Sequence, residues 1–249
     1  MEKSNNKTLI LTLAASALLS IGQHAAAHTR LDIATVNEGT RITNNVVIGH
    51  TCGAGTYVIG TSVVFPDGVD STVLVDGQPH AGALTDFVVN WGNNVQMFLN
   101  RSVFDLMNEK TNQLGNVVGF WAGGGPGLPD NLYAAVPFRL NAVNFESTSC
   151  AKSVKFNVSI IDICQITGPD ALHTPGVAEL WTHNNLGTVY DRDSETDNGP
   201  APLTIHRNLA TNPLPESCGE GVNVEVRPSA AQIERDMPII INGQRIWPQ

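Results

Sequence analysis

Short runs of β-branched and aromatic residues, separated by turn residues, recur along most of the chain. The clearest of these apolar runs, which we interpret as strands, are 46–48, 61–65, 71–75 and 154–161. Clusters such as 66–68, 76–77 and Gly123–Gly127 predict turns or loops between strands. Residues 103–113 are the one moderately helix-like stretch, and they show no amphipathic pattern. The spacing of the strands favours an all-β sandwich or open barrel over alternating βαβ units.

The first 27 residues follow a different pattern. Lys3 and Lys7 precede an apolar run over 9–21, and Ala25-Ala26-Ala27 follows it. This is the order of a secretory signal peptide, and the run is shorter than the roughly 20 residues of a membrane span. We expect cleavage after Ala27, which makes His28 the first residue of the mature protein. Cleavage after Ala25 or Ala26 is the alternative, and it would leave His28 without a free amine.

The rest of the chain is long enough for one sizeable β domain. Polar residues dominate from about Asp191, and a segment rich in Pro and Asn follows at 208–217. We therefore expect a signal peptide at 1–27, a β-sandwich domain at 28–207 and a loosely packed C-terminal extension at 208–249.

Charge and hydropathy narrow the range of partners. The net charge is −9, only 15% of residues are charged, and no basic stretch occurs, which argues against nucleic acid and anionic membranes. No second apolar run approaches a membrane span, and the chain ends at 244–249 without a hydrophobic tail. We expect an unanchored protein in the periplasm or secreted from the cell.

All four cysteines, Cys52, Cys150, Cys164 and Cys218, follow the expected cleavage site. An even number of cysteines in an oxidising compartment favours two disulfides. Their spacing alone allows three connectivities. The absence of a Cys-x-x-Cys pair argues against a zinc ribbon or a thioredoxin-like redox site.

An N-terminal His28 would offer a metal two nitrogens, its α-amine and its imidazole. Both lose a proton near neutral pH, and such nitrogen ligands suit Cu(II). His50 lies 22 residues later, with Gly39 at the midpoint. If 28–33 and 45–50 pair as antiparallel strands about Gly39, the two histidines face each other, which suits two ligands of one ion. The alternative is that His50 is a surface residue at the start of a loop.

Several short motifs occur in an order that resembles a known family. They are Ile48-Gly49-His50-Thr51-Cys52-Gly53, Val64-Phe65-Pro66-Asp67-Gly68-Val69, Gly119-Phe120-Trp121-Ala122-Gly123-Gly124 with Leu128-Pro129-Asp130, Phe156–Cys164 with Trp181 further on, and Gly199-Pro200-Ala201-Pro202-Leu203. With the leading His28, this set resembles the YcnI-like periplasmic copper-binding domains from His28 to about His206. Each motif is short, so the specificity lies in their order.

The resemblance implies an immunoglobulin- or cupredoxin-like β-sandwich with a role in copper acquisition or trafficking. It implies a Cu(II) site at His28, with a carboxylate and a tryptophan nearby. Trp121 is the better match to that tryptophan. No acidic residue stands at the position that matches the family's carboxylate. Glu38 is the preferred substitute for it, and Asp32 is the second choice. The resemblance also implies a Cys52–Cys164 disulfide, which leaves Cys150 to pair with Cys218.

Two other groups of residues contain side chains that can bind metal ions. Trp181-Thr182-His183, with His173 and His206, forms either a second copper site or ordinary surface loops. The acidic run 191–197 lacks the glycine and glutamate of an EF-hand loop and is interpreted as a solvated loop.

The expected function is copper binding without catalysis, since no nucleophile or metalloprotease motif occurs. The protein would hold Cu(II) at His28, with His50 or Glu38 completing the ligand set and Trp121 covering one face. It would pass copper to another periplasmic carrier or a membrane importer. The alternatives are a copper oxidase with an N-terminal histidine brace and a metal-free β-sandwich envelope protein.

Overall fold

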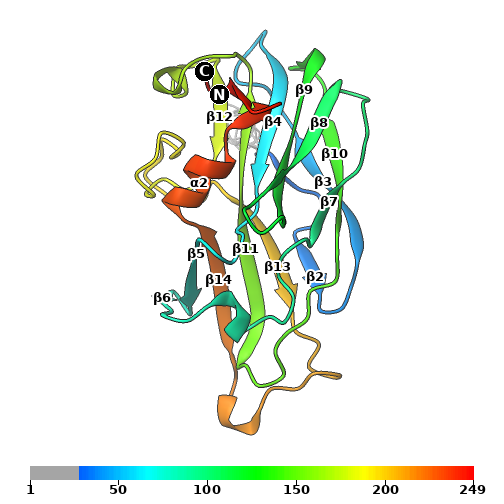
Figure 1. The fold of residues 1–249 in the computed structure, drawn as a ribbon, viewed down its shortest axis with the longest axis vertical. Coiled ribbons are helices and arrows are strands. Elements are labelled where there is room, and N and C mark those ends of the chain that lie inside the picture. The colour runs from blue at the N-terminus through cyan, green and yellow to red at the C-terminus, as the bar shows by residue number, and fades with distance from the viewer. Residues whose placement is uncertain (1–27) are drawn as a thin grey trace, which may run out of the picture.

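Strand β11 (Ala151–Ile163) runs through the middle of the molecule and organises the fold, as Figure 1 shows. The structure is a computed structural model that describes residues 28–249, so the predicted signal peptide lies outside the described residues. The remaining strands are β1 (Arg30–Leu31), β2 (Thr35–Asn37), β3 (Ile42–Ile48), β4 (Tyr57–Val64), β5 (Ser71–Val75), β6 (Gln78–Pro79), β7 (Val95–Met97), β8 (Leu106–Thr111), β9 (Val117–Pro129), β10 (Ala134–Leu140), β12 (Ala178–Trp181), β13 (Ala201–His206), β14 (Val222–Pro228), β15 (Ile239–Ile241) and β16 (Gln244–Trp247).

The strands form two main sheets and a hairpin. The smaller sheet has the order β1-β3-β10-β7. The larger has the order β6-β5-β14-β11-β4-β9-β8, with β12 and β13 also paired to β11 and β2 paired to β13. β15 and β16 form a separate hairpin, and α2 (Ala230–Asp236) is the one α-helix of the described residues. The expected all-β sandwich is therefore confirmed.

β11 has a neighbour on each edge along nearly its whole length. Its first half lies between β13 and β14, and its second half between β12 and β4. Its two faces are also covered. Phe156 and Ile160 belong to the core between the sheets, whereas Ile161 and Ile163 belong to a second apolar cluster on the outer face. The second half of the strand is buried on both faces, and Ile160, Ile161 and Ile163 give it the apolar character typical of such a strand.

The C-terminal residues 208–249 supply that outer cover. β14 pairs with both β11 and β5, so it is an internal strand of the larger sheet. α2 begins after Ser229, whose Oγ accepts a hydrogen bond from the Gln232 amide, and then packs Ile233 and Met237 into the outer cluster. The expectation of a loosely packed extension is thus corrected, because this segment buries one face of the central sheet.

Lys110 of β8 links the C-terminal end of α2 to the larger sheet through hydrogen bonds. Its Nζ donates hydrogen bonds to the carbonyl oxygens of Asp236 and Met237 at 2.6 and 3.0 Å, and to Ser62 Oγ at 2.6 Å. These carbonyls end α2 and have no partner within the helix, so the ammonium acts as a C-terminal cap.

The turn or loop predicted at Gly123–Gly127 is wrong, and the stretch with weak helical character forms a strand. Gly123–Gly127 lies inside β9 rather than in a loop, because Gly124, Gly125 and Gly127 take positive φ and let the strand bulge while its pairing with β4 continues on either side. Residues 106–111, within the most helix-like stretch, form β8 because β9 offers them a strand partner.

Both disulfides have the expected partners, Cys52–Cys164 and Cys150–Cys218. They lie at opposite ends of β11, since Cys164 follows its last residue and Cys150 precedes its first. Among residues 28–249, no helix has the length and apolar character that crossing a membrane requires.

The role of the C-terminal segment can be tested on α2. Ile233 is 1% exposed, so Ile233→Ala should lower the free energy of unfolding by about 2–4 kcal/mol through lost burial and a cavity. Glu234→Ala, on the exposed side of the same helix, should change it by less than about 0.5 kcal/mol. Urea unfolding followed by circular dichroism measures both. Equal, small effects would mean that α2 does not pack on the sheet.

Candidate functional site

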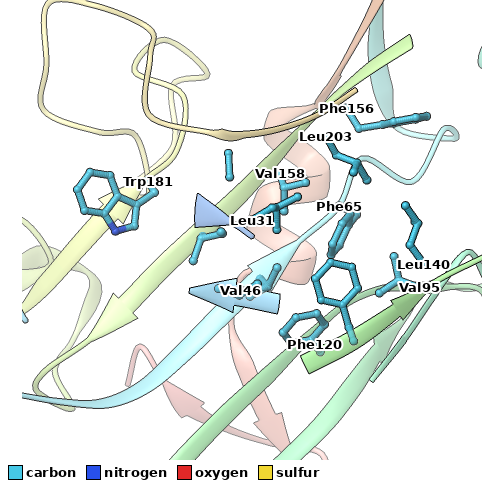
Figure 2. Close-up of a cluster of buried hydrophobic side chains, with 14 of the residues drawn as sticks. Leu31, Val46, Phe65, Val95, Phe120, Leu140, Phe156, Val158, Trp181 and Leu203 are labelled. Atoms are coloured by element: carbon cyan, nitrogen blue, oxygen red, sulfur yellow. The ribbon is translucent and has the colours of Figure 1, made fainter. Parts of the chain in front are cut away.

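Trp181 is the centre of the group of residues around His28. It ends β12, opposite Ile160 of β11, and its side chain faces the core between the sheets. Figure 2 shows it at one end of the buried cluster, away from Phe65 and Phe120. Only 5% of Trp181 is exposed, and its indole Nε1 donates a hydrogen bond to Asp162 Oδ2 at 3.1 Å. Trp181 therefore offers a fixed aromatic surface at the edge of the core.

His28 lies against this indole, with the two ring centroids 4.5 Å apart and the planes tilted by 41°. The following residues hold it there. Thr29 is buried and its Oγ1 donates a hydrogen bond to Asp162 Oδ2, and Arg30 and Leu31 form β1 on the edge of β3.

The predicted pairing of this segment with the strand before His50 is present, but it is shifted by one residue. Arg30 lies opposite Val47, whereas a pairing centred on Gly39 would place it opposite Ile48. The connection is not a simple hairpin, since β2 crosses to the larger sheet and pairs with β13. A shift of one residue changes which side chains share a face, so the direct opposition of His28 and His50 is not formed.

His50 nevertheless reaches the same tryptophan. Its ring meets the indole edge-on, with centroids 5.5 Å apart and an interplanar angle of 81°. His50 Nδ1 lies 2.7 Å from the Thr51 carbonyl oxygen, which can only accept, so Nδ1 carries a proton and Nε2 holds the lone pair when the ring is neutral. Two residues later, Cys52 is bonded to Cys164, so the disulfide fixes the His50 segment to the end of β11.

Asp162, which accepts the indole hydrogen bond, is a buried carboxylate between Ile161 and Ile163 of β11. Burial raises the pKa of Asp162 to about 6, and the hydrogen bonds from Thr29 and Trp181 and the charge of His50 only partly oppose this. Its cross-strand neighbour on β12 is Glu179, which shares a face with Trp181 two residues further on. Burial also raises the pKa of Glu179, with His50 and Arg192 opposing.

The surroundings of His28 favour its neutral form. Burial lowers the pKa of His28, and the charges of Arg192 and His50 lower it further. Arg192 comes from the 182–199 loop, and its guanidinium carbon lies 5.4 Å from the Trp181 ring centroid. A neutral imidazole has a free lone pair, which is the form that binds a metal.

The structure does not bring Glu38 to this group. Its carboxylate accepts hydrogen bonds from the backbone amides of Phe145 and Asn208 and from Asn212 Nδ2, at 2.7–2.9 Å. Its neighbour Asn37 pairs with His206 of β13, and His206 lies opposite Ser153 of β11. Trp181 lies opposite Ile160, which is seven residues further along β11. Seven residues of strand span roughly 23 Å. Glu38 thus joins loops at the far end of the sheet.

Trp121 is also elsewhere. It lies opposite Ser62 of β4, which lies opposite Ile161, so Trp121 faces the outer cluster rather than the core. Trp181 takes the place beside His28 that the sequence analysis assigned to Trp121. The substitute carboxylate, Asp32, is exposed and accepts a hydrogen bond from Asn45 Nδ2 at 3.3 Å.

The histidines proposed for a second site do not come together. His183 is buried and its Nδ1 lies 2.9 Å from Asp197 Oδ1, while His206 is exposed at the end of β13 and His173 is exposed in a loop. Residues 28–249 contain no group of three or more His, Cys, Asp or Glu side chains arranged to hold a metal ion. Any metal at His28 therefore needs a donor of another kind.

Sequence reasoning missed Asp162, Glu179 and Arg192. Asp162 carries a recognisable signal, because a lone carboxylate in a run such as Ser159-Ile160-Ile161-Asp162-Ile163 must be buried with the strand. Nothing in the sequence identifies Glu179 or Arg192, since only the pairing of β12 with β11 and the path of the 182–199 loop bring them to Trp181.

The buried carboxylate predicts a pH dependence of stability. Folding raises the pKa of Asp162 from 3.8 to about 6, so the folded state binds more protons between these values. The free energy of unfolding should therefore fall as pH rises from about 4 to about 6, by about 1–3 kcal/mol. Asp162→Asn should remove this component, whereas Asp193→Asn in the exposed loop should retain it. Urea unfolding across this pH range measures the difference, and identical slopes for Asp162→Asn and wild type would contradict it.

No family model matches this chain, and no curated protein does so. Among solved structures, it is similar to an uncharacterized protein from Nocardia farcinica that has an immunoglobulin-like fold. The two are 11% identical with a TM-score of 0.37, and the match covers 72% of this chain and 99% of that chain.

Proposed function

We propose that the protein is exported, cleaved before His28, and binds Cu(II) at the new N-terminus for copper acquisition or trafficking. The observation that carries the proposal is that His28 and His50 both contact the indole of Trp181, although 22 residues separate them. Two disulfides and the absence of a spanning helix among residues 28–249 are compatible with an exported protein.

The donor set needs the α-amine that cleavage would release. His28 would then supply that amine and its imidazole, and His50 would supply Nε2. Three nitrogens of this kind suit Cu(II). Glu179 replaces Glu38 in our proposal as the nearby carboxylate, because it shares a face with Trp181 and interacts with the charge of His50.

The neighbouring residues would support the site in distinct ways. Trp181 covers one side of His28 and limits the access of water, while its own N–H is engaged by Asp162. Burial and the charge of Arg192 lower the pKa of His28, which favours the unprotonated imidazole. The loop that carries His50 is held by Cys52–Cys164, so little reorganisation would accompany binding.

A second function also has an observation in its favour. An N-terminal histidine with a second histidine close by is the donor set of copper oxidases with a histidine brace, and the positions of His28 and His50 fit that set. Turnover of polysaccharides with ascorbate and peroxide would support the oxidase, and no turnover by the copper-loaded protein would support the trafficking role.

The copper site can be tested by comparing protein that begins at His28 with protein that carries one extra residue before it. The extension removes the free amine, so Cu(II) affinity should fall by more than about tenfold, because even losses outside the ligand shell cost about 10- to 100-fold. His50→Ala should weaken binding, whereas His183→Ala and His206→Ala should have little effect. Affinity should also fall as pH drops from about 7.5 towards 5.5 while the nitrogens gain protons.

Competition titration and EPR of the copper-loaded proteins measure these changes. Trp181→Phe should alter the spectrum and the affinity more than Trp121→Phe, since Trp121 faces the outer cluster. An extended protein with the affinity and spectrum of wild type would place the copper site elsewhere.

The two disulfides provide a matched test of how His50 is positioned. Removing Cys52–Cys164 with serines frees the His50 segment, so Cu(II) affinity should fall. Removing Cys150–Cys218 frees the other end of β11 and should leave affinity unchanged. The closed loops span 112 and 68 residues, so each loss should cost a similar 4–5 kcal/mol or so of stability on the chain-entropy model. Cu(II) titrations measure both affinities, at a temperature where near-UV circular dichroism shows that both variants are folded. Equal Cu(II) affinities of the two variants would contradict this prediction.

A further inference from the structure

A row of residues across the outer face of the larger sheet contains two glycines between two large apolar side chains. Ile163 of β11 lies opposite Gly60 of β4, Gly60 lies opposite Gly123 of β9, and Gly123 lies opposite Leu106 of β8. Residues directly opposite each other point to the same face of a sheet. The two middle positions of this row therefore expose bare backbone, and the sheet has a trough there.

The trough follows from how closely β4 and β9 approach. A Cβ atom on Gly60 would lie 3.1 Å from the Ala122 carbonyl oxygen, and one on Gly123 would lie 3.3 Å from that of Ile59. Both positions thus disfavour any side chain. The bulge that follows, with Gly124 and Gly125 at positive φ, extends the floor without adding side chains.

Apolar side chains enclose this floor and form a pocket of about 370 Å³. Trp121, in the next row of the sheet, forms one wall. The C-terminal hairpin forms another, and its lining residues are Ile239, Ile241, Ile246 and Trp247. At the mouth, Leu106 and Ile166 are 51% and 45% exposed.

The lining determines which chemistry fits. It contains no ionisable side chain, so a charged group inside the pocket would be buried without a partner, at a large cost in free energy. The volume lies near the lower end of the range for small-molecule sites, which suits one hydrocarbon chain rather than the two chains of a phospholipid.

We propose that this pocket binds the hydrocarbon chain of a free single-chain amphiphile, a fatty alcohol or fatty acid, and leaves the polar head at the mouth beside Leu106 and Ile166. The pocket lies on the face of the sheet opposite Trp181, so the proposal does not depend on copper binding.

The probe for the test is the neutral dye N-phenyl-1-naphthylamine, whose fluorescence rises in apolar surroundings. Titration of the full chain should give a saturable increase, and decan-1-ol and decanoate should both displace the dye. Leu106→Trp fills the trough and Ile166→Asp puts a carboxylate at its mouth, so each should weaken dye binding by roughly tenfold or more. Leu132→Trp, at an exposed position outside the pocket, should stay within about twofold of wild type.

Near-UV circular dichroism checks that each variant is folded, and hydrogen exchange provides a second readout. Because the hairpin lines the pocket, exchange of the β15 and β16 amides should slow when the dye or decan-1-ol is bound. Failure of the dye to saturate, or wild-type affinity in both Leu106→Trp and Ile166→Asp, would overturn the proposal. Co-sedimentation of the protein with phosphatidylcholine vesicles, if Leu106→Trp leaves it unchanged, would also overturn the proposal. That result would mean that the protein binds a membrane surface rather than a single hydrocarbon chain in the pocket.

Discussion

The requirement that β11 be covered on both edges and both faces shapes the whole molecule. Thirteen consecutive residues of this strand need partners for their backbone groups and cover for their apolar side chains. The edges are satisfied by four different strands. The smaller sheet covers one face, and α2 with the C-terminal hairpin covers the outer face of the second half. Residues 208–249 are therefore part of the packed β structure rather than a tail appended to a sandwich.

Asp162 is the one ionisable residue in the fully buried second half of β11, and the candidate site is built around it. A buried carboxylate is stable only with hydrogen-bond donors, and Thr29 and Trp181 provide them from two different segments. One group thereby anchors both the residue that follows His28 and the indole on which His28 lies. The Cys52–Cys164 bond at the end of the same strand adds the His50 segment. The geometry of the proposed copper site thus depends on interactions made one step away from its ligands.

The two faces of β11 support different chemistry. On the core side, Trp181, Glu179 and Asp162 form a polar group at the edge of the sandwich, with Arg192 and the two histidines beside them. On the outer side, the alternate residues of the same strands meet the C-terminal hairpin and leave an apolar pocket over Gly60 and Gly123. The alternation of side chains along a strand is what lets one sheet carry both.

The sequence by itself predicted the all-β class and a strand over 154–161, because these depend on local composition, and the resemblance of its ordered motifs to a known family implied the pairing of the cysteines. The same reasoning proposed His28 and His50 as copper ligands, but it expected Glu38 and Trp121 to lie beside them. Those assignments required knowing which face of the sheet each residue occupies and how far along it each lies. That information comes from long-range pairing: Trp181 opposite Ile160, β2 crossing to β13, and Trp121 opposite Ser62. A shift of one residue or one strand changes the face, and nothing local in the sequence specifies it. The sequence also did not predict that β14 pairs with β11, since a parallel pairing between distant segments leaves no pattern in the sequence of either segment.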